Sequence, residues 1–245
     1  MSRALCQECQ RPTKACICKF AVSIENDISV IILQHPSEVG QSKGTVSLLK
    51  QSLAKCEVMV GENFDDSAVL SLRLKHYADK TALLYPSEQA LLLDYSALKP
   101  ATPNIDNYVE SDVESDVESD VESDVESDVE STVKCGVEDE STKTLTNGVL
   151  ADIECIIILD GTWKKAYRMF MLNPCLQQIK HIVLPQGITS LYQIRKTKKD
   201  NALSSLEACC HALARLENAP EKYQNLLSSF VKFNEFQQSF NQSNH

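Results

Sequence analysis

The sequence predicts an α/β fold, built on a largely parallel sheet with helices on both faces. Short apolar runs of strand length alternate with segments whose apolar residues recur at i, i+3, i+4 and i+7, the spacing of a helix face. Several runs are apolar throughout, as is typical of strands buried on both sides. With 245 residues, 43% of them hydrophobic, the chain can form one large domain or two small ones.

The expected elements follow one another along the chain. Strands are expected at residues 28–33, 57–60, 81–85, near 91, 156–160 and 181–184. Helices are expected from about 45, at 68–75, from 162 and at about 221–240. A loop is expected between the last strand and Leu203. Ser204 and Glu207 then match a capping box that begins one further helix. Its apolar face consists of Leu206, Cys209, Cys210, Leu213 and Leu216.

A low-complexity segment interrupts this alternation. Residues 110–130 contain five tandem Ser-Asp-Val-Glu units, with eleven acidic and no basic residues. Such a repeat buries too little apolar area to offset its ordering entropy, so we expect a disordered insertion at about 100–147. An acidic tail that binds a partner is the alternative. Without the eleven acidic residues the net charge changes from −10 to +1, so the acidic composition does not exclude a nucleic-acid partner.

No apolar stretch approaches the ~20 residues of a membrane span, and the N-terminus lacks the apolar region of a signal peptide. We therefore expect a cytoplasmic protein without a membrane partner. In that compartment the ten cysteines are expected to be reduced thiols or metal ligands rather than disulfides.

Four of these cysteines lie close together near the N-terminus. Cys6 and Cys9 form a Cys-x2-Cys pair, and Cys16 and Cys18 form a Cys-x-Cys pair. Zn2+ takes four thiolates in a tetrahedron, and two close pairs supply them from two turns. We therefore expect a zinc-binding segment at 1–22, followed by a second domain at 23–245. A thiol-rich terminus without metal is the alternative, and the other six cysteines are expected to be core or incidental residues.

A strand-turn-helix segment carries the most specific pattern. An apolar run ends in Asp160, turns at Gly161, and continues from Thr162 and Trp163 into a helical spacing. In open α/β sheets ligands bind at the carboxyl ends of strands, so this turn is expected to line a binding site. A structural explanation is equally open, in which Thr162 caps the helix and Asp160 accepts hydrogen bonds from free amides in its first turn.

Two other loops carry polar groups after strands. The first strand runs into His35 and Glu38, and Gly44 with Thr45 begins the next helix, whose free amides suit a carboxylate or phosphate. Surface or capping roles are the alternatives for His35 and Glu38. The densest basic cluster, with Tyr192 before it, is by its pattern a solvated charge run, and cations that steer an RNA backbone are the alternative. That cluster consists of Arg195, Lys196, Lys198 and Lys199.

Taken together, these motifs resemble the DTW-domain family. The tetrapeptide Asp160-Gly161-Thr162-Trp163 is similar to the D-x-T-W signature. Further matches follow in the family's order: His35-Pro36-Ser37-Glu38, Lys43-Gly44-Thr45, Leu184-Pro185, Ser190-Leu191-Tyr192-Gln193-Ile194-Arg195 and Leu203-Ser204-Ser205-Leu206-Glu207-Ala208. The resemblance covers about 6–96 and 150–216. It departs at 39–42, where many family members carry a more basic run.

The resemblance implies a SPOUT-like fold with a trefoil knot near the cofactor site. It also implies a tRNA-uridine aminocarboxypropyltransferase, which moves the 3-amino-3-carboxypropyl group of S-adenosylmethionine to N3 of a tRNA uridine and releases 5′-methylthioadenosine. Asp160 is then expected to accept the N3 proton, and Thr162 and Trp163 are expected to be catalytic residues beside it. The zinc is expected to be structural, and the basic cluster to bind tRNA.

The residues expected to bind S-adenosylmethionine lie in or beside loops that follow strands. They are His35, Glu38, Gly44, Thr45, Pro86, Leu159, Gly161, Leu184, Ser190 and Tyr192. Two other functions remain open from the residues alone. One is a SPOUT-type S-adenosylmethionine-dependent RNA methyltransferase, and the other is a non-catalytic zinc-containing RNA-binding module.

Overall fold

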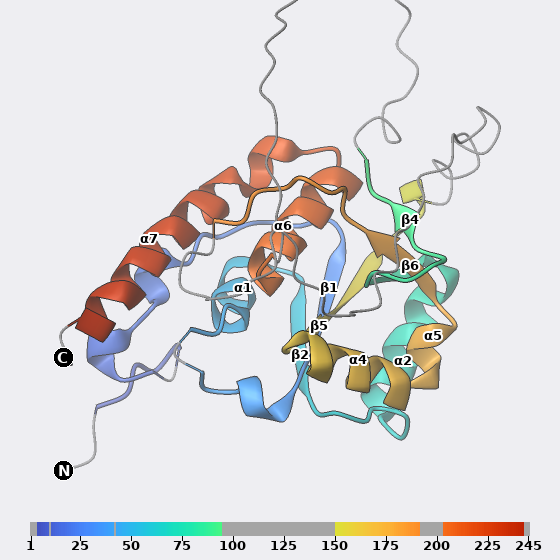
Figure 1. The fold of residues 1–245 in the computed structure, drawn as a ribbon, viewed down its shortest axis with the longest axis horizontal. Coiled ribbons are helices and arrows are strands. Elements are labelled where there is room, and N and C mark those ends of the chain that lie inside the picture. The colour runs from blue at the N-terminus through green and yellow to red at the C-terminus, as the bar shows by residue number, and fades with distance from the viewer. Residues whose placement is uncertain (1–3, 10, 42, 95–149, 192–202, 243–245) are drawn as a thin grey trace, which may run out of the picture.

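The computed structural model describes residues 4–9, 11–41, 43–94, 150–191 and 203–242. The acidic insertion expected at about 100–147, Tyr192 and the basic cluster at 195–199 lie outside the described residues. The described part is an α/β fold whose parallel sheet has helices on both sides (Figure 1). None of the helices described is both long enough and apolar enough to cross a membrane.

The sheet has six strands in the order β2-β1-β5-β3-β6-β4, and every neighbouring pair is parallel. Their bounds are β1 Ser29–Gln34, β2 Cys56–Val60, β3 Thr81–Leu84, β4 Leu91–Leu92, β5 Cys155–Asp160 and β6 Lys180–Val183. All six expected strands are thereby confirmed within a few residues. Strand β5 is central, and its first four residues are buried because both of its faces are covered.

Side chains that alternate along the strands build two separate cores. One face packs against α1 (Val46–Ser52), α6 (Ser205–Leu216) and α7 (Gln224–Gln242). The opposite face packs against α2 (Ala68–Tyr77), α4 (Trp163–Leu172) and α5 (Pro174–Gln177). In β5, Ile156 and Ile158 point into the first core and Ile157 into the second, so Asp160 continues the row that faces α6.

Helix α6 begins as the sequence predicted, the start of α7 is corrected, and α5 was not predicted. The capping box is present: the Ser204 hydroxyl accepts from the Glu207 amide at 3.2 Å, and the Glu207 carboxylate accepts from the Ser204 amide at 2.8 Å. The last helix begins at Gln224 rather than near 221, because Pro220 starts a short 3-10 turn, η6 (Pro220–Tyr223). Helix α5 was not predicted, since four residues are too few to show a helical period.

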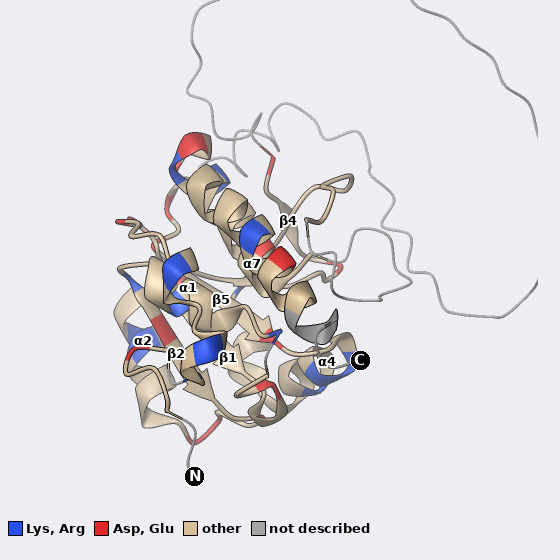
Figure 2. Cartoon of the chain, turned by 90° about the vertical axis from the view of Figure 1, so that its left-hand side faces the viewer, with Lys and Arg blue, Asp and Glu red and all other residues tan. Residues whose placement is uncertain are grey.

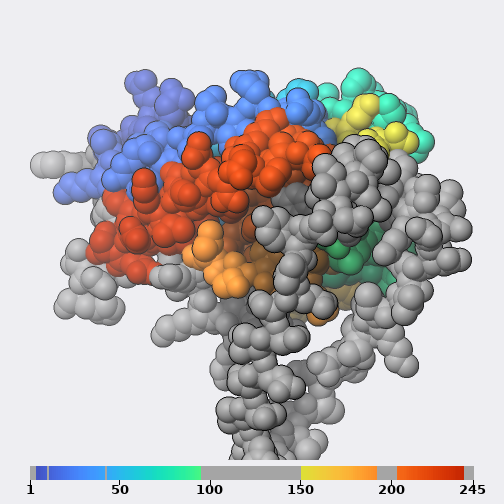
Figure 3. Space-filling model, turned by 90° about the horizontal axis from the view of Figure 1, so that it is seen from above, coloured from blue at the N-terminus to red at the C-terminus, as the bar shows by residue number. Residues whose placement is uncertain are grey.

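The N-terminal segment lies beside the C-terminal helix (Figure 3). Two more 3-10 turns, η1 (Thr13–Ala15) and η2 (Cys18–Phe20), are its helical elements in the part of the chain that the structure describes. Phe20 packs edge to face on Phe233, and Ser229 in α7 donates to the Phe20 carbonyl at 2.7 Å. On its other side, Arg11 donates to the Gly44 carbonyl at 3.1 Å, so the segment also contacts the loop before α1.

Candidate active site and metal centre

Strand register brings two polar side chains together at the carboxyl edge of the sheet. Gln34 and Asp160 are the last residues of β1 and β5 and are direct partners in the ladder. The Gln34 amide donates to Asp160 Oδ2 at 2.9 Å, and the Ser205 hydroxyl from α6 donates to Oδ1 at 2.6 Å. Asp160 is only 9% exposed. Each carboxylate oxygen therefore has one donor in place and keeps further acceptor capacity.

The structure does not show the alternative in which Thr162 caps α4 and Asp160 accepts hydrogen bonds from amides in its first turn. Thr162 is the N-cap of α4 by position, but its side chain makes no capping hydrogen bond. The donors to Asp160 come from β1 and α6 and not from the first turn of α4. Thr162 and Trp163 are both exposed, so the indole is not part of the core.

The turn after β5 touches the turn after β1. A Cβ at Gly161 would lie in van der Waals contact with the His35 Cβ at 3.7 Å, and tightly at 3.1 Å from the Lys165 Cβ in α4. The His35 amide donates to the Asp160 carbonyl at 2.9 Å. Lys165 pairs with Glu38 at 2.8 Å. Segment 35–38 and the Asp160 turn therefore form one unit. The sequence motifs had predicted the two loops separately and had not predicted that they are in contact.

His35 is buried and both of its ring nitrogens are engaged. The Ser37 amide donates to Nδ1 at 3.1 Å, so Nδ1 is an acceptor and the ring proton lies on Nε2. Nε2 then donates to Glu62 Oε1 at 2.6 Å, and the other Glu62 oxygen pairs with Arg168 Nε at 3.1 Å. His35 is thus a fixed hydrogen-bonded group rather than a free base. Glu62, two residues after β2, was not predicted.

The other expected cofactor residues lie at several distinct places. Thr45 is buried at the N-cap of α1 without a side-chain capping bond. Pro86 follows β3 and is exposed, and Leu184 follows β6 and packs on the core beneath α6. Leu159 packs on the core beneath α2 and α4. Since Asp160 faces α6, the side chains of Leu159 and Asp160 lie on opposite faces of the sheet.

The Glu207 carboxylate accepts hydrogen bonds from residues on both sides of the connection that leads to the N-terminus of α6. It is 1% exposed, and both of its oxygens accept from the Ser190 hydroxyl at 3.1 Å. The Leu191 amide also donates to Oε1, while the Ser204 amide donates to Oε2. The expected capping role is confirmed, and the same carboxylate holds Ser190 beside the helix end that carries Ser205.

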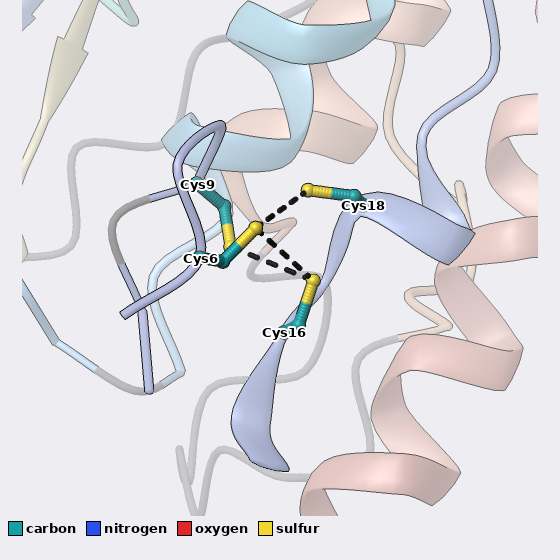
Figure 4. Close-up of side chains that lie close together, drawn as sticks. All are labelled: Cys6, Cys9, Cys16 and Cys18. Atoms are coloured by element: carbon teal, nitrogen blue, oxygen red, sulfur yellow. Dashed lines mark hydrogen bonds between the residues drawn. The ribbon is translucent and has the colours of Figure 1, made fainter. Parts of the chain in front are cut away.

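The four N-terminal cysteines converge with their sulfur atoms within 4.8 Å of one another (Figure 4). Sγ–Sγ distances are 3.5 Å for Cys6 and Cys16, 3.7 Å for Cys6 and Cys18, and 3.9 Å for Cys9 and Cys16. A tetrahedron with Zn–S bonds of about 2.3 Å has sulfur atoms about 3.8 Å apart, whereas a disulfide bond is about 2.05 Å long. The donor set fits a tetrahedral metal, and four thiolates leave no open position for catalysis.

The ionisation of Cys6 differs from that of the core cysteines. Hydrogen bonds from the backbone of Cys9 and Glu8 lower the pKa of Cys6 to about 6. Burial raises the pKa of Cys18 to about 12. Burial likewise raises the pKa of Cys209 and Cys210, which are fully buried in α6 as the sequence predicted. The N-terminal cluster therefore contains a thiolate that the backbone stabilises, as a metal ligand requires.

Comparison with known proteins gives a consistent picture. A family model described as the DTW domain matches residues 3–238. Three curated relatives carry the name tRNA-uridine aminocarboxypropyltransferase 2. The protein from Macaca fascicularis is 27% identical over 240 residues, which is 96% of this chain and 64% of the relative. The Mus musculus protein is 26% identical over 220 residues, with 88% and 57% covered, and the Drosophila melanogaster protein is 27% identical over 237 residues, with 92% and 71% covered.

The chain therefore spans about 64% and 57% of the length of the first two relatives. No solved structure matches the chain.

Proposed function

The chain belongs to the DTW domain family, and on this basis we propose that it is a tRNA-uridine aminocarboxypropyltransferase. In this proposal it transfers the 3-amino-3-carboxypropyl group of S-adenosylmethionine to N3 of a tRNA uridine. The names of the three relatives support the activity. Within the molecule, the proposal depends most on the buried Asp160 carboxylate, held by Gln34 and Ser205 at the carboxyl edge of the sheet.

The reaction needs an acceptor for one proton. Uridine N3 must lose its imide proton before its electron pair attacks the γ-carbon of the methionyl chain. The C–N bond forms as the C–S bond breaks, and 5′-methylthioadenosine leaves with the electron pair. Asp160 is proposed to take the proton, because its oxygens keep acceptor capacity beside the two donors that fix them. Holding N3 in line with the carbon supplies the rest of the rate enhancement.

S-adenosylmethionine is proposed to lie over the carboxyl ends of β5, β3 and β6. Gly161, Pro86 and Leu184 directly follow or closely follow these strands. Ser190 borders the same region through Glu207. His35 and Leu159 are proposed to shape the pocket through the main chain, since the His35 ring and the Leu159 side chain are occupied within the protein. Four more residues are proposed to bind S-adenosylmethionine: Glu38, Gly44 and Thr45 from the loop before α1, and Tyr192.

The basic cluster is proposed to bind tRNA phosphates. It lies in the sequence between Ser190 and Ser204, which flank the proposed site. Replacing Lys198 and Lys199 by Ala should flatten the log–log salt dependence of tRNA binding by about 1–2 units, while the affinity for S-adenosylmethionine changes little. Equal weakening of both affinities would place this loop in the cofactor pocket instead.

A SPOUT-like fold with a trefoil knot is the finer proposal for the architecture. Its support is the sheet order, in which β5 pairs between β1 and β3, and β6 pairs between β3 and β4. This strand order is compatible with a threaded chain. An experimental structure that traces 192–202 between β6 and α6 tests it, because the path of that connection decides whether the chain passes through a loop.

Residues 1–22 are proposed to form a zinc-binding segment on a catalytic domain at 23–245. Cys6, Cys9, Cys16 and Cys18 would hold Zn2+, which would supply a cross-link between the two turns. The zinc is proposed to be structural, because the four sulfur atoms fill its coordination sphere. The chemistry at Asp160 needs no metal, since the sulfonium is already an activated leaving group.

The decisive test is mass spectrometry of tRNA nucleosides after incubation with the protein and S-adenosylmethionine. An aminocarboxypropyl adduct on uridine supports the proposal. A methyl adduct would instead indicate a SPOUT-type methyltransferase, and tRNA binding without any adduct would indicate an RNA-binding module. The Asp160→Asn variant is the matched control, since it separates protein-dependent transfer from adducts already present in the tRNA.

A further inference from the structure

Helix α4, which begins directly after the Asp160 turn, presents an aromatic face to solvent. Trp163 is 56% exposed and Tyr167 is 58% exposed. The two rings are four residues apart and therefore lie on one side of the helix, about 6 Å apart along its axis. The buried residues of the helix are Ala166 and Met169. Large aromatic side chains so exposed are not needed for the core and indicate a binding surface.

The same helix is positively charged. The sequence of α4 contains Lys164, Lys165 and Arg168 and no acidic residue (Figure 2). Lys165 pairs with Glu38, whereas Lys164 has no ion-pair partner in the described part of the chain. Arg168 pairs with Glu62 through Nε but stays 68% exposed, so other N–H groups of its guanidinium can still donate.

We propose that Trp163 and Tyr167, with Lys164 and Arg168, form a docking surface for unpaired nucleotides of the tRNA that flank the target uridine. This proposal rests on the proposed function, because it specifies how the same site holds its RNA. Proteins bind single-stranded RNA by stacking bases on aromatic rings while cations meet the backbone, and this face offers both. Its charge also complements phosphate.

The position of the face decides which nucleotides it would hold. Trp163 is three residues after Asp160, and α4 covers the sheet face opposite to α6. The target base would approach Asp160 while its neighbours rest on α4. Trp163 is then an RNA-stacking residue, and the indole does not take part in proton transfer or wall the adenosine of S-adenosylmethionine.

The test uses Trp163 as its own reporter, because it is the single tryptophan of the chain. Titration of the full-length protein with bulk tRNA, and separately with a short oligouridylate, should quench its fluorescence to saturation. By filter binding, Trp163→Ala and Tyr167→Ala should each weaken tRNA affinity on the order of 5- to 150-fold, the range of one lost base–aromatic stack. Trp163→Phe should retain most of the affinity because it keeps a ring.

Met171→Ala is the matched control, since Met171 is 52% exposed on the same helix but has no ring. It should leave tRNA affinity unchanged. All variants should keep the wild-type melting temperature, because the side chains replaced are exposed, and calorimetry should show unchanged binding of S-adenosylmethionine. The double variant Lys164→Ala with Arg168→Ala should flatten the salt dependence of tRNA binding by about 1–2 units of log–log slope.

Three results would overturn this inference. Unchanged tRNA affinity in both alanine variants would remove the stacking role. Weaker S-adenosylmethionine binding with normal tRNA binding would place the indole in the cofactor pocket. Fluorescence that changes with protein concentration alone, and no longer does so in Tyr167→Ala, would make the face an interface between copies.

If the wild type modifies tRNA but both alanine variants bind normally, the inference fails alone. If Trp163-dependent binding persists without any adduct, the proposed function fails alone.

Discussion

The sheet edge around Asp160 and the N-terminal cysteine cluster are organised in opposite ways. Asp160 is held by Gln34 from β1 and Ser205 from α6, and both elements are fixed by the core. The cysteines lie on short turns, where Ile17 and Phe20 are the buried side chains. Thiols are weak donors and acceptors, so contacts between them stabilise little. The sheet edge is therefore preorganised by the fold, whereas the cysteine cluster gains little stability from its own sulfur contacts.

The largest expected effect is at the preorganised region. Asp160→Asn can still accept from Gln34 and donate to the Ser205 hydroxyl, so the fold and the affinity for S-adenosylmethionine should persist. It cannot take the N3 proton, and general-base catalysis is typically worth ~10²–10⁴-fold, so kcat should fall by that order. Single-turnover kinetics with mass spectrometry measures it. Near-normal turnover would show that Asp160 only positions other groups, and that the edge is preorganised for binding alone.

Loss of the proposed zinc ion should affect the N-terminal cysteine cluster first. Cys16→Ser should lower the zinc content from about one ion per chain to nearly none, and make the N-terminus sensitive to proteolysis, because a structural zinc site supplies much of its own folding free energy. Metal analysis and limited proteolysis measure this, with Cys175→Ser as the control. If zinc removal also abolishes transfer, the two regions are coupled, and the Arg11 contact to Gly44 is the connection to test next.

The cysteine cluster is also expected to bind zinc in a pH-dependent way. The pKa of Cys6 is lowered to about 6, so its thiolate persists down to that pH and is lost below it. The pKa of Cys18 is raised to about 12, so a metal must displace its proton even at neutral pH. Zinc affinity should therefore fall as the pH falls, most steeply below about 6, where the Cys6 thiolate also binds a proton. A zinc-sensitive dye during a pH titration checks this, and zinc retained at pH 4 would contradict thiolate ligation.

A smaller effect is expected for Ser205→Ala. The Asp160 carboxylate then loses one of its two donors, and a hydrogen bond to a charged group of this kind corresponds to a loss of about 10-fold in kcat. Ser229→Ala is the matched control, because its hydroxyl bonds to the Phe20 carbonyl at the cysteine segment. It should loosen that segment and leave kcat unchanged. The opposite pattern would contradict the separation of the two regions.

The smallest effect is expected for deletion of 110–130. The repeat carries eleven acidic residues and few apolar groups, so it should contribute to neither region. Transfer rate, zinc content and melting temperature should all stay near the wild-type values. A drop in melting temperature of several degrees would show that the insertion packs on the domain.

The sequence predicted the strands well because their residues are apolar without interruption, as in Ile156 to Ile158. It also predicted the Ser204 capping box and the cysteine cluster, since these depend on short spacings. It did not predict Gln34, Glu62 or Ser205 as partners of the site. Those contacts depend on register and on packing between distant elements, which local periodicity does not contain. A polar residue at the end of an apolar strand was the available signal for Gln34.

Glu207 has a consequence for how proteins of the DTW domain family can diversify. By holding Ser190 and Leu191 on one side and Ser204 on the other, one buried carboxylate fixes both ends of the connection that carries the basic cluster. A connection with fixed ends can change length cheaply, at about 0.6 kcal/mol per doubling. In the proposed function, substitutions and insertions there would alter which tRNA is chosen while Ser205 and Asp160 stay in place. Selection would then explore new tRNA substrates without disturbing the chemistry proposed at Asp160.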